Sequence, residues 1–134
     1  MKKNPATPAL LLRLEGAALF IVALAVYREL GLSWWLFVLL FLMPDLSFLG
    51  YFGGTRVGAM VYNAAHTYTL PAGLWLLGFW GERGWMMGVA LIWAAHIGLD
   101  RLIGFGLKYP TVFKPTHLQQ VALEPQPPPT TVSL

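Results

Sequence analysis

Long apolar stretches separated by short polar joints make up most of the chain. Each stretch has at least 20 residues, and a helix needs about 20 residues to cross roughly 30 Å of hydrocarbon. Strands of a membrane barrel would instead alternate polar and apolar positions, which these stretches do not do. The pattern therefore predicts four transmembrane helices, over residues 10–30, 33–52, 56–80 and 84–107.

Glycines and charges occupy the joints between these stretches, for example Gly53-Gly54 and the run at 81–84. Short joints place consecutive helices side by side and antiparallel. Pro44 interrupts the second stretch and predicts a kink, with backbone carbonyls freed nearby. The expected fold is an all-α membrane protein, a four-transmembrane-helix antiparallel bundle with short loops.

The two ends of the chain differ from the apolar stretches. Residues 1–9 are expected to form a cytoplasmic N-terminus, and residues 10–107 the four-helix transmembrane domain. Two prolines in 108–118 favour a cytoplasmic loop packed on the bundle over a fifth helix. Residues 119–134 are rich in proline and cannot build a core, so they are predicted to be a disordered C-terminal tail.

Basic residues predict the orientation in the membrane, because cytoplasmic loops are enriched in Lys and Arg. Seven of the nine basic residues fall on one side of the four predicted helices. These seven are Lys2, Lys3, Arg13, Arg56, Arg101, Lys108 and Lys114. Both termini are therefore predicted to be cytoplasmic, in a multi-pass protein of the cell membrane.

Composition narrows the classes of partner and chemistry. The chain is 57% hydrophobic and 11% charged, which suits contact with a lipid bilayer. Its basic residues form no stripe interleaved with exposed aromatics, so no nucleic-acid partner is expected. The absence of cysteine excludes thiolate ligands and thiol nucleophiles, which leaves nitrogen and oxygen chemistry. Whether the protein forms a homo-oligomer stays open.

Polar residues within the helices fall at one predicted depth, roughly 7 to 16 Å from the cytoplasmic boundary at 1.5 Å per residue. A charged side chain inside a bilayer costs at least about 2.5–3.5 kcal/mol, so such residues usually face one another or a wet cavity. An inward-facing cluster is therefore predicted. Its members are Glu15, Asp45, Asn63, His66, His96 and Asp100.

The types of residue in this layer suit two kinds of chemistry. In the first, His66, His96 and Asp100, with Asp45 or Glu15, ligate a divalent cation of the zinc or iron type. In the second, His96 is a general base oriented by Asp100, four residues further along the same helical face. The candidate catalytic residues are His96, Asp100, Glu15, Asp45 and Asn63. The candidate substrate-binding residues are Arg101, Lys108 and His117.

Several short motifs resemble a known family. They include Pro44-Asp45-Leu46-Ser47, Tyr62-Asn63 with His66-Thr67-Tyr68, and the run Ala95-His96-Ile97-Gly98-Leu99-Asp100-Arg101. In this order they resemble a bacterial membrane-protein family catalogued as domain of unknown function 4260. The resemblance implies a compact protein of the bacterial inner membrane and carries no catalytic assignment.

Three functions fit these residues. The favoured one is a membrane-embedded hydrolase, with or without a metal, that acts on a lipid or other amphipathic substrate near the cytoplasmic leaflet. In the second, the polar layer only fixes helix register in a structural or accessory protein, as hydrogen bonds between membrane helices can. In the third, the same residues conduct protons or ions. No His-Glu-x-x-His or Gly-x-Ser-x-Gly motif decides among them, so whether the protein is an enzyme stays open.

Overall fold

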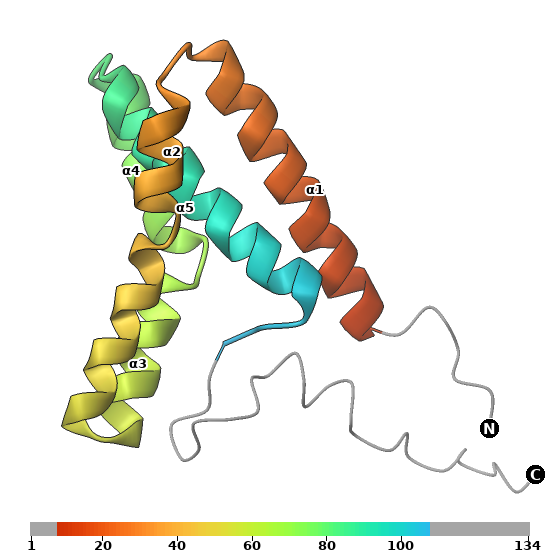
Figure 1. The fold of residues 1–134 in the computed structure, drawn as a ribbon, viewed down its shortest axis with the longest axis vertical. Helices are drawn as coiled ribbons and strands as arrows, with labels where there is room; N and C mark the ends of the chain where they lie inside the picture. The colour runs from red at the N-terminus through yellow and green to blue at the C-terminus, as the bar shows by residue number, and fades with distance from the viewer. Residues whose placement is uncertain (1–7, 108–134) are drawn as a thin grey trace, which may run out of the picture.

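The computed structural model describes residues 8–107, and nearly all of them are helical (Figure 1). The helices are α1 (Pro8–Glu29), α2 (Trp34–Phe41), the 3-10 helix η1 (Met43–Gly53), α3 (Thr55–Ala65), α4 (Thr69–Trp80) and α5 (Gly84–Ile103). The expected cytoplasmic loop and disordered tail fall outside the described residues.

Three helical stretches are long and apolar enough to cross a membrane, namely Pro8–Glu29, Trp34–Gly53 and Gly84–Ile103. Large apolar side chains cover much of the outer surface. Leu39 is 75% exposed and Phe52 is 91% exposed, which would be costly in water over so wide an area. The all-helical fold and these apolar stretches are consistent with a membrane protein.

The third predicted helix is not continuous. Residues 56–80 were expected to form one span, but α3 ends at Ala65 and α4 begins at Thr69. The physical reason is Pro71, which has no N–H to give the carbonyl of Thr67 and whose ring would clash with that carbonyl in a continuous helix. As a result, neither α3 nor α4 is long enough to cross a membrane alone.

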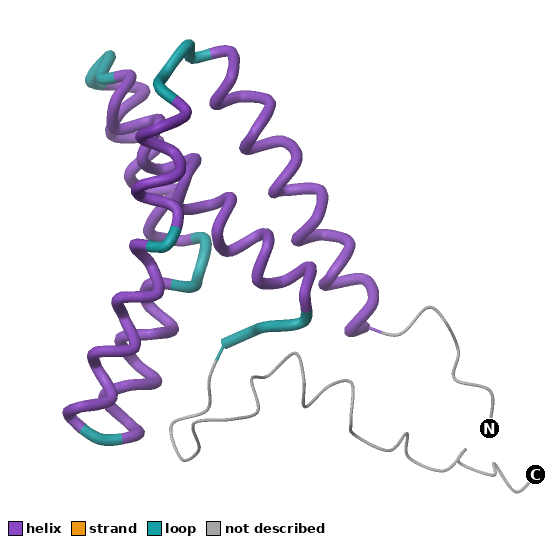
Figure 2. Tube along the Cα trace, in the orientation of Figure 1, coloured by secondary structure: helices purple, strands orange, loops and turns teal. Residues whose placement is uncertain are grey.

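The second predicted helix is also interrupted. It turns at Leu42, where α2 gives way to η1, and Pro44 lies in the first turn of η1. The expected kink at Pro44 is therefore a change of helix type. Figure 2 shows this joint and the joint between α3 and α4 at a similar height along the molecule. Two interrupted helices thus place irregular backbone at one level.

The crossing of α1 and α5 forms the largest helix interface among the described residues. Gly16 and Gly98 let the two backbones meet, as small residues do between membrane helices. A Cβ atom on Gly98 would lie 2.7 Å from the carbonyl oxygen of Gly16, and one on Gly16 would lie 2.7 Å from that of Gly98. Ala23 and Ala95 are buried in the same helices.

The remaining helices form two further pairs. η1 and α3 pack against each other as a hairpin, with the ring of Tyr51 over Gly58, and α4 packs on α5. The hairpin has few contacts with α5. These few contacts include the polar residues described below.

Substitution of Gly98 tests the α1–α5 crossing. Gly98→Val would force backbone apart at a point with no free space, and overpacking of this kind costs about 1–3 kcal/mol. We expect a lower midpoint of thermal unfolding in detergent. The matched control is Gly73→Ala in α4, where a Cβ atom meets nothing within 4 Å. The higher helix propensity of alanine stabilises the folded helix by up to about 1 kcal/mol, so this variant should not unfold at a lower temperature. Equal midpoints for Gly98→Val and the wild type would contradict this packing.

Candidate metal centre

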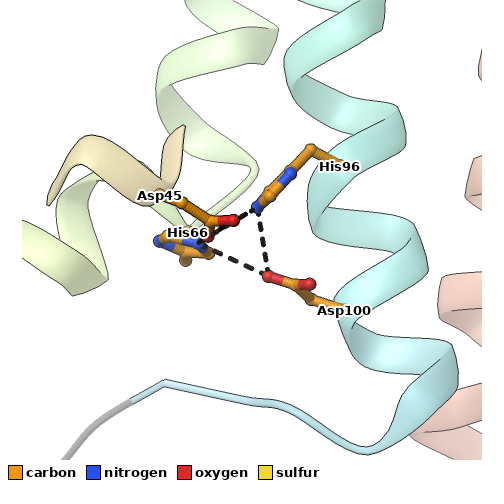
Figure 3. Close-up of side chains that lie close together, drawn as sticks. All are labelled: Asp45, His66, His96 and Asp100. Atoms are coloured by element: carbon orange, nitrogen blue, oxygen red, sulfur yellow. Dashed lines mark hydrogen bonds and ion pairs between the residues drawn. The ribbon is translucent and has the colours of Figure 1, made fainter. Parts of the chain in front are cut away.

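Four side chains from three elements converge where the helices are interrupted (Figure 3). Asp45 lies in the first turn of η1, and His66 is the C-cap residue that follows the end of α3 at Ala65. His96 and Asp100 lie one turn apart on α5, so they share a helical face. One nitrogen or oxygen atom from each of the four lies within 4.8 Å of the others.

The distances among these atoms are nearly equal. The two Nε2 atoms of His66 and His96 are 3.4 Å apart. The Oδ1 atom of Asp45 is 3.4 Å from Nε2 of His66 and 3.1 Å from Nε2 of His96. The Oδ2 atom of Asp100 is 3.4 Å and 3.2 Å from the same two nitrogens.

These separations match the ligand spacing of a single metal ion. Zinc binds histidine nitrogen and carboxylate oxygen at about 2.0–2.2 Å, so neighbouring ligands in a tetrahedral site are about 3.3–3.6 Å apart. The five measured distances of 3.1–3.4 Å lie at or just below that range. One ion could therefore contact all four residues with little movement of the side chains.

The ring of His66 is oriented for such a role. Its Nδ1 atom lies 2.9 Å from the carbonyl oxygen of Tyr62, which can only accept, so Nδ1 carries the proton and donates. In the neutral ring Nε2 then presents a lone pair to the cluster. Histidines that bind metals commonly fix their second nitrogen on a carbonyl in this way. The ring of Tyr62 stacks on His66 with centroids 3.8 Å apart, which holds the imidazole plane.

The ring of His96 is held by packing. It is 2% exposed, and the edge of Phe41 from the end of α2 lies against it with centroids 5.3 Å apart. Its Nε2 atom faces Asp45, His66 and Asp100. Phe41 therefore positions the second histidine much as Tyr62 positions the first.

The electrostatics of this group favour a cation. Two ionised carboxylates bring two negative charges, while neutral imidazoles bring none and His66 adds a further lone pair. Arg101 follows Asp100 but makes no ion pair with it within the described part of the chain. Uncompensated charge is costly at a buried site. A divalent cation would cancel both charges and occupy the point toward which the lone pairs are directed.

Exposure differs across the four residues. His66 is 1% exposed and His96 2%, whereas the Asp100 side chain is 19% exposed and that of Asp45 42%. The histidines form the closed side of the group. Asp45 forms its open side, the one from which water or another molecule would reach an ion.

Side chains from α5 satisfy the carbonyls that the end of α3 leaves unpaired. The indole nitrogen Nε1 of Trp93 donates to the carbonyl oxygen of Ala65 at 2.6 Å. The guanidinium nitrogen Nη2 of Arg101 donates to the carbonyl oxygen of His66 at 3.1 Å. An unpaired carbonyl inside a membrane would cost several kcal/mol. These two bonds hold His66 in place by its own backbone.

Trp93 was not among the residues predicted from the sequence. The signal was available, since Pro71 requires the preceding helix to end and therefore leaves carbonyls that need donors. The sequence does not show which donors lie opposite these carbonyls. Arg101 was expected to bind substrate, and in the structure its guanidinium also donates to the carbonyl of Phe105 at 3.4 Å.

The other predicted site residues lie elsewhere. Glu15 is exposed on α1 and stands outside the group of four, because its neighbour Gly16 occupies the crossing with α5 and turns Glu15 to the side. Asn63 is half-buried on α3, three residues before His66. Lys108 and His117 lie outside the described residues. The structure thus brings together His66, His96, Asp100 and Asp45, the predicted metal ligands.

The fold and the site together define a class: an all-helical protein with three helices long and apolar enough to cross a membrane and with a histidine–aspartate group, suited to a metal ion, at the interruptions of two helices. A family model matches residues 9–121 of the chain, and its description is domain of unknown function (DUF4260). The chain belongs to this family, as the motifs in its sequence indicated. No curated protein and no solved structure matches it.

Replacing Trp93 tests the capping of α3. Trp93→Phe keeps an aromatic ring but leaves the carbonyl of Ala65 without this donor, a loss worth about 1–3 kcal/mol for a buried group. We expect a lower midpoint of thermal unfolding. Trp80→Phe is the matched control, because Trp80 is 74% exposed at the end of α4. Equal shifts for the two variants would contradict the capping role.

Proposed function

We propose that this protein is a membrane-embedded, metal-dependent hydrolase whose centre consists of Asp45, His66, His96 and Asp100. The observation that carries the proposal is the near-equal spacing of one oxygen or nitrogen atom from each residue, 3.1–3.4 Å in five pairs. Two imidazoles and two carboxylates form a ligand set that zinc, iron or manganese accepts.

The four residues have different roles in this proposal. His66, His96 and Asp100 hold the ion, since they are the more buried ligands. A divalent ion held by these residues would supply an activated water and would polarise the bond to be cleaved. Asp45, on the open side, accepts the proton of that water and passes it to the leaving group.

The proposed topology puts this chemistry within one leaflet. In it α1, the α2–η1 stretch with its joint at Leu42 and α5 each cross the membrane, and α3 and α4 together make a fourth, interrupted crossing. Interrupted helices recur at binding sites inside membranes, because irregular backbone there must line a cavity or be buried in protein. Both termini are placed in the cytoplasm by the distribution of Lys and Arg. The site then faces the cytoplasmic leaflet.

A hydrolase suits the surroundings of the site better than an ion pathway does. A pathway needs polar groups on both sides of the centre. On the side of the predicted outer leaflet, two apolar side chains lie next to the centre. Phe41 packs against His96, and the buried Ile92 lies one turn before His96 on α5. The centre is therefore open toward Asp45 and closed by apolar side chains in the other direction.

A structural role is the second candidate, and one observation favours it. The η1–α3 hairpin has few contacts with α5, and Asp45 and His66 of the hairpin meet His96 and Asp100 of α5 at the site. An ion held there would join the hairpin to the rest of the molecule. Metal binding without hydrolysis would support this role.

Metal analysis tests the centre directly. We expect the protein, purified in detergent without chelators, to carry about one equivalent of a divalent transition metal by mass spectrometry. His96→Ala should lose it, because a buried ligand is removed. Glu15→Gln is the matched control and should keep its metal, since Glu15 lies outside the group. Metal-free protein in all preparations, with no uptake of added Zn²⁺ or Co²⁺, would exclude a metal centre.

A second experiment separates catalysis from a structural role. Chelation should abolish hydrolysis of a panel of amphipathic esters, and returning the metal should restore it. Asp45→Asn should keep most of the metal but lower kcat by about 10²–10⁴-fold, the usual contribution of a general base. If the metal-loaded protein hydrolyses none of the esters and chelation only lowers its thermal midpoint, the structural role is the correct one.

A further inference from the structure

An apolar pocket of about 220 Å³ lies beside the proposed metal centre. Its walls come from α2 and from η1, α3 and α5, the three elements that supply the four residues of the centre. Six of its lining residues are Met43, Pro44, Ser47, Ala65, Ile92 and Trp93.

The pocket and the centre are contiguous along the chain. Pro44 and Ala65 immediately precede Asp45 and His66 of the centre. Ile92 lies one turn before His96 on α5, so both side chains are on the same face of that helix. Pro44 and Ser47 lie on either side of Asp45, the most exposed of the four residues. An apolar ligand with one polar end, bound in the pocket, would therefore have that polar end at the open side of the centre.

Ser47 is the polar exception in this apolar lining. Its hydroxyl oxygen is buried and has no hydrogen-bond partner in the described part of the chain. A buried hydroxyl without a partner costs about 1–3 kcal/mol. A ligand oxygen held near the centre would provide the missing partner. The pocket thus combines apolar walls with one unused hydrogen-bond donor close to a metal-binding group.

We infer that the substrate is an ester of an unbranched acyl chain, which binds with its first methylenes in this pocket and its carbonyl at the metal. This inference rests on the proposed function and names the substrate class for it. Hydrolysis consumes one water: its oxygen bonds to the acyl carbon, the ester C–O bond breaks, and the leaving alcohol takes the proton. The carboxylate product keeps the acyl chain and so binds the same pocket.

Carboxylate products give a test that needs no turnover. The protein is loaded with Co²⁺, whose visible spectrum changes when its ligands change, and is titrated with acetate, propionate, butyrate, pentanoate and hexanoate. Each methylene buried from water should raise affinity by up to about fourfold. Detergent micelles without protein correct for free acid. We expect affinity to rise along the series and to level off once the pocket is full.

Substitutions at the far end of the pocket test whether the acyl chain of the acid binds there. Val89 lines the pocket two turns before His96 on α5. Val89→Phe should leave acetate binding unchanged and remove the gain for hexanoate, whereas Val89→Ala should extend the rise to longer acids. The matched control is Leu76→Phe, because Leu76 lines a separate groove between α1, α4 and α5. This variant should change none of the affinities.

The outcomes distinguish this inference from the proposed function. If Co²⁺ binds and every acid binds with the affinity of acetate, the acyl pocket is wrong and the metal centre stands. An equal effect of Val89→Phe on acetate and hexanoate would also contradict the pocket. If Co²⁺ does not bind, the metal centre and the acyl pocket fail together. If affinity rises with the length of the acid, and if Val89→Phe removes this rise while Leu76→Phe does not, the result supports both the metal centre and the acyl pocket.

Discussion

A backbone carbonyl buried away from water needs a hydrogen-bond donor from the protein, and this requirement organises the molecule. Pro71 prevents one continuous helix over residues 56–80, so α3 ends with unpaired carbonyls at Ala65 and His66. Trp93 and Arg101 of α5 supply the donors. These two bonds pair the free carbonyls at the end of α3 and hold the backbone at His66. The same contact therefore places the His66 side chain opposite His96.

The ligand group then follows from which elements meet at the interruptions. η1 begins at a second joint at the same level and carries Asp45 in its first turn. α5 adds His96 and Asp100 one turn apart. The α1–α5 crossing at Gly16 and Gly98 supports α5 from its other side, so the ligands with the firmest support are those on α5. The hairpin ligands depend on the end of α3 and on the contact with α5.

The contrast between a charged centre and an apolar pocket gives the site its proposed specificity. Two carboxylates in a buried group favour a cation, and the cation in turn favours an oxygen ligand from a substrate. The adjacent pocket offers almost only apolar surface together with the hydroxyl of Ser47. An amphipathic molecule satisfies both parts at once, since its polar linkage and its chain occupy neighbouring but different environments.

The sequence by itself determined the apolar stretches and the family, and it predicted that the polar residues gather at one depth. These follow from length, composition and spacing along one helix, which are local properties: His96 and Asp100 share a face because 3.6 residues complete a turn. The proline at position 71 was also present in the sequence, and with it the local reason for the break in the third predicted helix.

Only the tertiary structure decided which members of the polar layer meet. Glu15 and Asp45 are predicted at similar depths, yet Gly16 packs on α5 and turns Glu15 aside, while the η1 joint directs Asp45 toward the histidines. Trp93 gained its role because it lies opposite the end of α3. Depth depends on position along one helix, whereas convergence depends on the rotation and crossing of several, which the packing of side chains between them sets.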